Sequence, residues 1–108
     1  MMDIRIYTDE TGRAPFEEWL NALKDAQGRA RVRARIARLQ AGNFGDCKPL
    51  RGGVLELRID QGPGYRVFLS RQGPLMVLLL CGSDKSEQDK AIGLALAYLA
   101  DWKQRGSI

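Results

Sequence analysis

The sequence predicts an α+β fold: a small, curved, mostly antiparallel sheet with two helices before its main strands and one helix after them. Residues 48–71 hold two runs that alternate apolar and polar side chains around a glycine-rich turn, which is the pattern of a β-hairpin. Residues 75–80, LMVLLL, are apolar at every position, which predicts a strand covered on both faces. Residues 15–41 and 86–106 instead repeat apolar side chains at helical spacing.

Length and composition indicate one globular domain that spans residues 1–108. The net charge of +4 permits a nucleic-acid partner without requiring one. The sequence has no histidine, and Cys47 and Cys81 form no C-x-x-C pair, so we expect no metal site and no cofactor. We interpret both cysteines as small buried hydrophobic residues. The lack of histidine also excludes a hydrolase that uses a Ser-His or Cys-His pair.

The N-terminal stretch MMDIRIY lacks the basic start and apolar run of a signal peptide. No run approaches the roughly 18 apolar residues of a membrane span. We therefore expect a cytoplasmic protein with no membrane partner.

The N-terminal part of the chain predicts a strand followed by a helix. Residues 3–7 alternate, with Ile4 and Ile6 facing inward, and Thr11-Gly12 ends the strand. Pro15 suits the first position of a helix, because its missing N–H needs no partner there. An apolar stripe follows at i, i+3, i+4 and i+7, which we interpret as core rather than as a ligand platform: Phe16, Trp19, Leu20 and Leu23.

A second helix is expected from about Ala26 to Ala41, with Gly42-Asn43 as its stop. Helical periodicity separates two groups on it: the buried line Val32, Ile36 and Leu39, and on one flank the arginines Arg31, Arg35 and Arg38. Such arginines commonly form a solvated face whose stems lie over the core. This flank could instead hold an acidic partner segment.

In the predicted hairpin both apolar rows must face one core, which pairs odd-numbered residues with odd-numbered ones. A three-residue turn at residues 61–63 meets this requirement and sets Arg58 directly opposite Arg66. Like charges in such a pair destabilise a hairpin by roughly 0.2–1 kcal/mol, whereas an anionic ligand such as phosphate would stabilise them. Further cations flank the hairpin: Lys48, Arg51 and Arg71. Two interpretations stay open, an anion-binding surface or ordinary solvated charges partnered by Glu56 and Asp60.

The C-terminal part predicts a loop and a last helix. Residues 81–85 are expected to form the loop after the buried strand, and Ser86, with Asp89 three residues later, has the pattern of a helix N-cap. The helix would end near Gly106, and its core stripe would comprise Ile92, Ala95, Leu96 and Leu99.

Five segments occur in a specific order: PFEEWLNAL, the arginine-rich second helix, GNFGDCKPLRGGVLELRI, GPGYRVF and VLLLCGSDKSEQ. Together they resemble the RelE/ParE superfamily of toxins, and most of all its HigB-like branch of addiction-module killer proteins. The resemblance covers the chain from Tyr7 to about Trp102. It implies a RelE-like domain of a type II toxin–antitoxin system that inhibits growth by cleaving messenger RNA on the ribosome. It also implies a cognate antitoxin, often a helix-turn-helix protein.

The resemblance implies roles for single residues. Arg66 of GYR matches the arginine that contacts the scissile phosphate, while Arg58 of ELR and Lys85 lie near two further basic residues of that site. Lys48 and Arg51 match the general basic lead-in of the family rather than a defined role, and together with Arg71 they are expected to contact RNA. The antitoxin would cover the basic sheet face or the flank of Arg31, Arg35 and Arg38. Where many members carry a tyrosine or histidine near the start of the last helix, this chain has the sequence DKSEQD.

The implied chemistry is metal-free attack of an RNA 2′-hydroxyl on the adjacent phosphate, which needs a base, an acid and fixed cations. Arg58 and Arg66 would supply the fixed charge. Lys85 is the expected acid, because burial among cations would make its ammonium a readier proton donor. Glu56 is either the base or a salt-bridge partner of Arg58. Two other functions stay open, a ParE-like DNA gyrase inhibitor without nuclease activity and a non-catalytic RNA-binding regulatory module.

Overall fold

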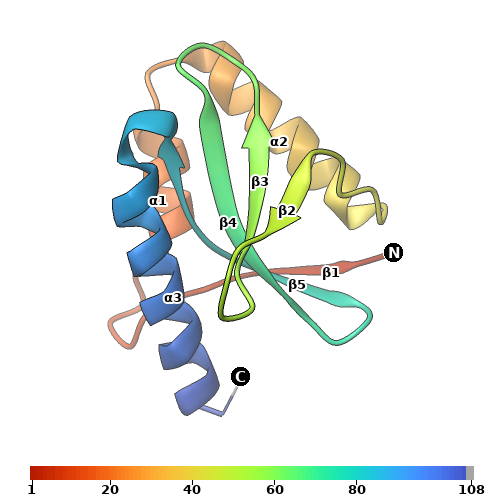
Figure 1. Cartoon of the computed structure of the whole chain (residues 1–108), viewed down its shortest axis with the longest axis vertical. Helices are drawn as coiled ribbons and strands as arrows, with labels where there is room; N and C mark the ends of the chain where they lie inside the picture. The colour runs from red at the N-terminus through yellow and green to blue at the C-terminus, as the bar shows by residue number, and fades with distance from the viewer. Residues whose placement is uncertain (107–108) are drawn as a thin grey trace.

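The computed structural model describes residues 1–106 as a five-stranded mixed sheet with helices on both faces (Figure 1). The elements follow in this order: β1 (Asp3–Ile6), α1 (Pro15–Ala22), α2 (Ala26–Gln40), β2 (Cys47–Pro49), β3 (Leu55–Ile59), β4 (Tyr65–Gln72), β5 (Met76–Asp84), a 3-10 turn η1 (Lys85–Glu87) and α3 (Gln88–Gln104). The predicted α+β class, with two helices before the main strands and one after them, is confirmed. Among the described residues no helix has the length and apolar composition needed to cross a bilayer.

The strand order in the sheet is β1-β5-β4-β3-β2. The pairs β2–β3, β3–β4 and β4–β5 are antiparallel, and β1 lies parallel to β5. The sheet is therefore mostly antiparallel, as expected, but mixed at the edge where the N-terminal strand joins it. The short strand β2 extends the meander at its other edge, where it pairs with β3.

Two apolar cores lie on the two faces of the sheet. α1 and α2 cover one face, where the buried members include Phe16, Leu20, Val32, Leu39, Leu57, Ile59, Val67, Leu69 and Leu79. α3 covers the other face, where the buried members include Phe68, Leu78, Leu80, Ala95, Leu99 and Trp102. The prediction that the LMVLLL strand is covered on both faces is confirmed for residues 77–80, whereas Leu75 precedes β5 and is exposed. The face of β4 that was expected to be polar and exposed is buried in its middle, where Phe68 and Ser70 lie.

The hairpin register matches the prediction. Ile59 lies opposite Tyr65, and Arg58 lies opposite Arg66. The ladder ends at the Ile59–Tyr65 pair, so residues 60–64 connect the strands, a longer connection than the expected three-residue turn. Tyr65 faces the core and donates a hydrogen bond to Asp25 Oδ2 at 2.9 Å.

A β-bulge changes the register between β4 and β5. Phe68 lies opposite Cys81, and the next residue, Leu69, lies opposite Leu79, so Leu80 has no partner of its own. Leu80 and Cys81 both belong to the core beneath α3. After the bulge Gly82 lies beneath the Trp19 ring on the other face, where a Cβ would come within 2.2 Å of the indole.

The predicted loop at residues 81–85 and the predicted Ser86 N-cap are both wrong. β5 continues to Asp84, because residues 81–84 stay paired with β4. Asp84 Oδ1 then accepts a hydrogen bond from the backbone N–H of Glu87 at 3.2 Å and caps the 3-10 turn. The Ser86 hydroxyl donates to the same carboxylate instead of capping the helix.

Candidate functional site

The loop end of the hairpin and the turn after β5 form a cleft with a volume of about 400 Å³. Its lining is polar and charged: Asp46, Arg58, Asp60, Gly62, Pro63, Gly64, Arg66 and Lys85. All three residues predicted to be catalytic are therefore brought together, although they come from β3, β4 and the turn after β5. The backbone N–H of Lys85 donates to the carbonyl of Gly64 at 2.9 Å, which holds this turn against the hairpin loop.

Arg58 and Arg66 lie on the same face of adjacent antiparallel strands, as predicted. Between them lies Glu56, whose side chain is 0% exposed. Arg58 Nε donates to Glu56 Oε1 at 2.9 Å, and Arg66 Nε lies 3.8 Å from the same oxygen. Gln88 donates from the first turn of α3 to the other carboxylate oxygen, Oε2. The interpretation of Glu56 as a salt-bridge partner of Arg58 is confirmed.

The arginine pair still has donors to offer. Within residues 1–106 neither terminal nitrogen of Arg58 has a hydrogen-bond acceptor, and the Arg58 side chain is 38% exposed. Arg66 is 13% exposed, its Nη1 donates to the carbonyl of Tyr65, and its buried Nε has no hydrogen-bond partner in the described part of the chain. The hydrogen bond that Arg58 donates to Glu56 raises the pKa of Arg58, so this guanidinium stays charged. Fixed cations with spare N–H groups suit an anion with several oxygen acceptors.

Lys85 lines the cleft but is exposed, so the expectation that it is buried among cations is wrong. Strand β5 is longer than predicted, and it carries Lys85 past the covered part of the sheet to its rim. Two carboxylates, Asp46 and Asp60, also line the cleft. Sequence reasoning treated Asp60 only as a partner for surface charge, and it missed Asp46. The only signal for Asp46 was its place just before Lys48, in a segment that pairs with β3.

The three cations predicted to bind RNA lie outside this cleft. Lys48 is exposed on β2, opposite Glu56. Arg51 and Arg71 line a separate pocket of about 350 Å³ formed largely by residues 49–55. Arg71 also donates to the carbonyl of Pro74 at 3.0 Å, and its guanidinium lies 5.3 Å from the centroid of the Phe44 ring. Arg51 and Arg71 therefore belong to a different site from the arginine pair, whereas Lys48 lies outside the cleft as the cross-strand neighbour of Glu56.

The flank formed by Arg31, Arg35 and Arg38 is not uniformly exposed to solvent. Arg35 is half-buried and donates to the backbone carbonyls of Arg58, Phe44 and Asp46. Burial lowers the pKa of Arg35. Its guanidinium therefore fastens the segment before β2 against β3, which corrects its assignment to an open flank. Arg31 and Arg38 are exposed.

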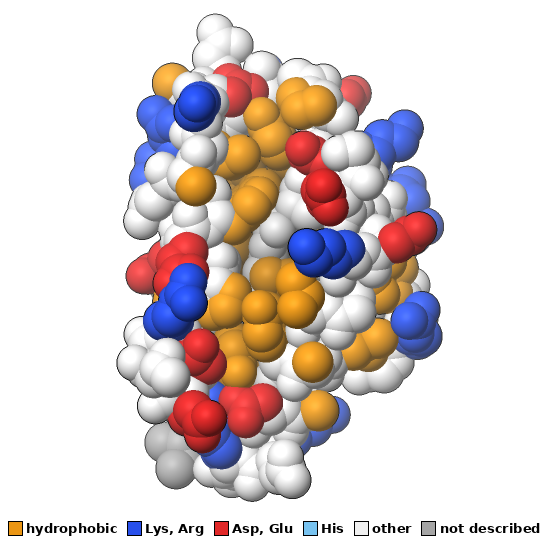
Figure 2. Space-filling view, turned by 90° about the vertical axis from the view of Figure 1, so that its left-hand side faces the viewer, with side chains coloured by type: hydrophobic (Ala, Val, Ile, Leu, Met, Phe, Trp, Pro, Cys, Tyr) orange, Lys and Arg blue, Asp and Glu red, His pale blue; other side chains and the backbone are white. Residues whose placement is uncertain are grey.

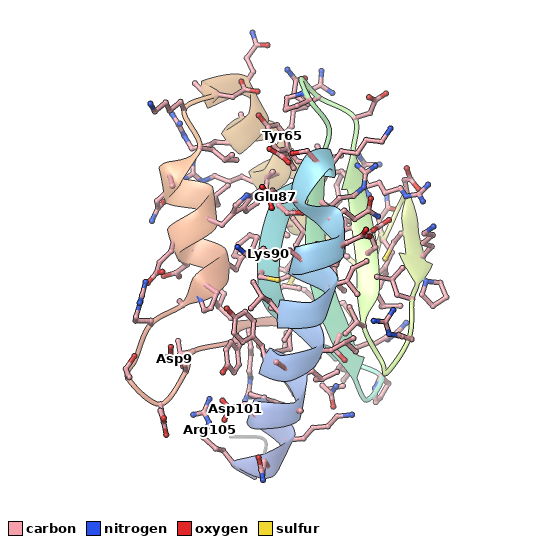
Figure 3. All side chains as sticks on the ribbon, turned by 60° about the vertical axis from the view of Figure 1, so that its left-hand side comes forward. Asp9, Tyr65, Glu87, Lys90, Asp101 and Arg105 are labelled. Carbon is pink, nitrogen blue, oxygen red and sulfur yellow. The ribbon has the colours of Figure 1, made fainter. Side chains whose placement is uncertain are left out.

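A second, less polar groove runs between α1 and α3. Figure 2 shows a band of hydrophobic side chains on this face, with charged side chains along both of its edges. Trp19, Gly82 and Leu94 contribute to a pocket of about 350 Å³ there, and Glu87 and Lys90 lie at its rim (Figure 3). This groove does not hold the paired arginines.

The cysteines do not contribute reactive groups to the cleft. Cys81 is buried beneath α3, and burial raises its pKa to about 12. Cys47 is only half-buried, less than expected, and burial raises its pKa as well.

Comparison with known proteins identifies a relative of this chain. No family model matches the sequence. A protein of Haemophilus influenzae is 53% identical to the chain over 91 residues, which cover 84% of this chain and 88% of that protein. The chain belongs to the same family as this protein. The Haemophilus influenzae relative is described as uncharacterized, so the family membership carries no function with it.

Proposed function

We propose that the chain is a RelE/ParE-type toxin of the HigB-like branch, and that it acts as a ribosome-associated endoribonuclease on messenger RNA. The observation that carries the proposal is the cleft in which Arg58, Arg66 and Lys85 meet from three separate segments. An RNA phosphate is an anion of the size and charge that such a cleft suits. The RelE-like fold assignment rests on the ordered sequence motifs and agrees with the α+β architecture.

In the proposed reaction the 2′-hydroxyl attacks the adjacent phosphorus, and the bond to the leaving 5′-oxygen breaks. A base takes the hydroxyl proton, and an acid protonates the leaving oxygen. Arg58 and Arg66 stabilise the developing charge on the phosphate with fixed donors. Lys85, at the rim, is the proposed acid. Asp46 and Asp60 are the carboxylates that line the cleft and are the proposed proton acceptors.

The proposal includes a cognate antitoxin, a helix-turn-helix protein, as partner. Its contact would cover the basic cleft or the exposed Arg31 and Arg38 of α2. Both surfaces favour an acidic segment, because opposite charges steer association and fix its orientation.

One observation favours a second candidate, a ParE-like gyrase inhibitor. The lining of the cleft contains neither histidine nor tyrosine, the two side chains expected to transfer protons near the start of the last helix. A binding protein that occupies gyrase, or a non-catalytic RNA-binding module, would need only the fixed cations.

Induction of the chain in a growing host, followed by mapping of messenger-RNA ends and a gyrase supercoiling assay, separates these functions. The nuclease proposal expects growth arrest with new RNA ends that appear within coding regions. Arrest without new ends, together with loss of supercoiling, would support gyrase inhibition. Unaffected growth, RNA and supercoiling would leave only the binding module.

A further inference from the structure

Glu56 is a charged side chain at 0% exposure, placed directly under the arginine pair. A buried carboxylate is unfavourable unless its oxygens are paired and hydrogen-bonded. Here both oxygens accept a hydrogen bond, Oε1 from Arg58 Nε and Oε2 from Gln88, and Arg66 Nε lies 3.8 Å from Oε1 as an ion-pair contact. The carboxylate therefore holds three side chains that come from three different elements.

The arrangement determines which part of each guanidinium is available. An arginine has five N–H donors in a planar fork, so engagement of Nε by a fixed carboxylate fixes the plane in which the terminal nitrogens lie. Without a negative charge between them, the directly opposed Arg58 and Arg66 would repel each other and separate. A displacement of about 1 Å in a catalytic group can reduce a rate about 10²-fold.

We propose that Glu56 is a positioning residue that fixes the guanidiniums of Arg58 and Arg66 toward the cleft, and that Gln88 holds Glu56 in place from α3. The inference rests on the proposed function only where RNA cleavage is measured. It also excludes Glu56 as the general base. Its oxygens are both engaged, its side chain is fully buried, and it is absent from the lining of the cleft.

The test uses Glu56→Gln in the full chain, because glutamine keeps the shape and one acceptor while it removes the charge. The positioning role expects the Nε–H signal of Arg58 to lose its protection, and the Nε–H signal of Arg66 to shift, in ¹⁵N–¹H spectra of the free protein. It expects single-turnover cleavage of messenger RNA to fall about 10²-fold. Affinity for a 2′-O-methyl RNA oligonucleotide, which cannot be cleaved, should stay equal or become tighter, because the site has lost a negative charge.

Retained or tighter binding together with slower cleavage is the decisive result, because a role confined to stabilising the fold would weaken both binding and cleavage. An Arg58 Nε–H signal that remains protected would overturn the inference. So would a pH–rate profile in which Glu56→Gln removes the acidic limb, because that result would identify Glu56 as the base. Glu87→Gln is the matched control, since the same charge is lost from an exposed neighbour of Gln88, and it should change none of these measurements.

Gln88→Ala provides a second route if Glu56→Gln folds poorly. It leaves all charges in place and removes only the donor to Oε2, so the same signals should change to a smaller degree. If the unaltered protein cuts no RNA, the nuclease proposal fails on that result alone. The Nε–H signals and the affinity for the oligonucleotide or for inorganic phosphate still decide the role of Glu56.

Discussion

Replacing Arg66 by alanine tests the proposed chemistry most directly. The side chain stands on the polar end of β4 and is 13% exposed, so truncation removes both a donor and some buried stem. A positioned donor at a developing oxyanion is worth roughly 2.7–4 kcal/mol, or 10²–10³ in rate. We therefore expect Arg66→Ala to abolish growth arrest.

The cost to stability should be smaller. Alanine lacks two of the methylenes of Arg66, each worth about 0.8 kcal/mol when buried. Removing one of two opposed cations returns roughly 0.2–1 kcal/mol. The net loss of about 1 kcal/mol corresponds to a melting temperature lower by about 4–8 °C. This is small beside a typical unfolding free energy of about 5–15 kcal/mol, so the variant should remain folded.

The assay compares growth after induction, messenger-RNA ends and thermal melting for Arg66→Ala, Arg66→Lys and a control. Arg66→Lys should restore growth arrest only in part, because the point charge of an ammonium cannot replace the planar fork of donors of a guanidinium. Arg13→Ala is the control, since Arg13 is exposed and pairs with Glu18 on α1, outside the cleft. A folded Arg66→Ala protein that still arrests growth, with no RNA cut by either form, would refute the reasoning and favour gyrase inhibition.

Three further predictions follow from the structure. Gly82→Ala should lower the melting temperature, because its Cβ would lie 2.2 Å from the Trp19 ring and overpacking costs about 1–3 kcal/mol; Gly93→Ala, with open space around it, should not lower it. Hydrogen bonds from the backbone of Gly28 and then from Tyr65 lower the pKa of Asp25, so its stabilisation is present above the unfolded value and is lost as pH falls through the folded value. As pH falls below about 4, the melting temperature of Asp25→Asn should therefore decrease less than that of the unaltered protein. Association with the antitoxin should slow as salt rises, and stopped-flow rates that ignore ionic strength would contradict an electrostatic contact.

The hairpin register and the two-sided burial of the LMVLLL strand could be predicted because each depends on a short period in the sequence. Alternation of period two forces Leu57 and Val67 to the same face, and this automatically places Arg58 beside Arg66. The start of α1 was predictable for a similar reason, because Pro15 suits only the first turn of a helix.

The rest depends on contacts between segments that no local pattern contains. Helical periodicity gives the direction of Arg35 but not the backbone carbonyls that it meets there. A glutamate that alternates with leucines is expected on the solvated face of a strand, and no local pattern shows that Gln88 at the start of α3 meets the buried Glu56. The glycine and polar residues after Cys81 suggested a loop, because nothing local indicates that β4 is long enough to pair with them.

The bulge at Leu80 affects which changes in length the sequence of β5 can accept during evolution. It inserts one residue into the alternation of β5, so the side chains on its two sides follow opposite phases. Deleting Leu80 would restore a regular strand and leave Cys81 and Gly82 on their present faces, because Leu80 and Cys81 already face the same core. β5 can therefore lose this one residue without turning Gly82 away from the indole of Trp19. A relative whose β5 is one residue shorter at this point should keep the same inward and outward residues on both sides of the deletion.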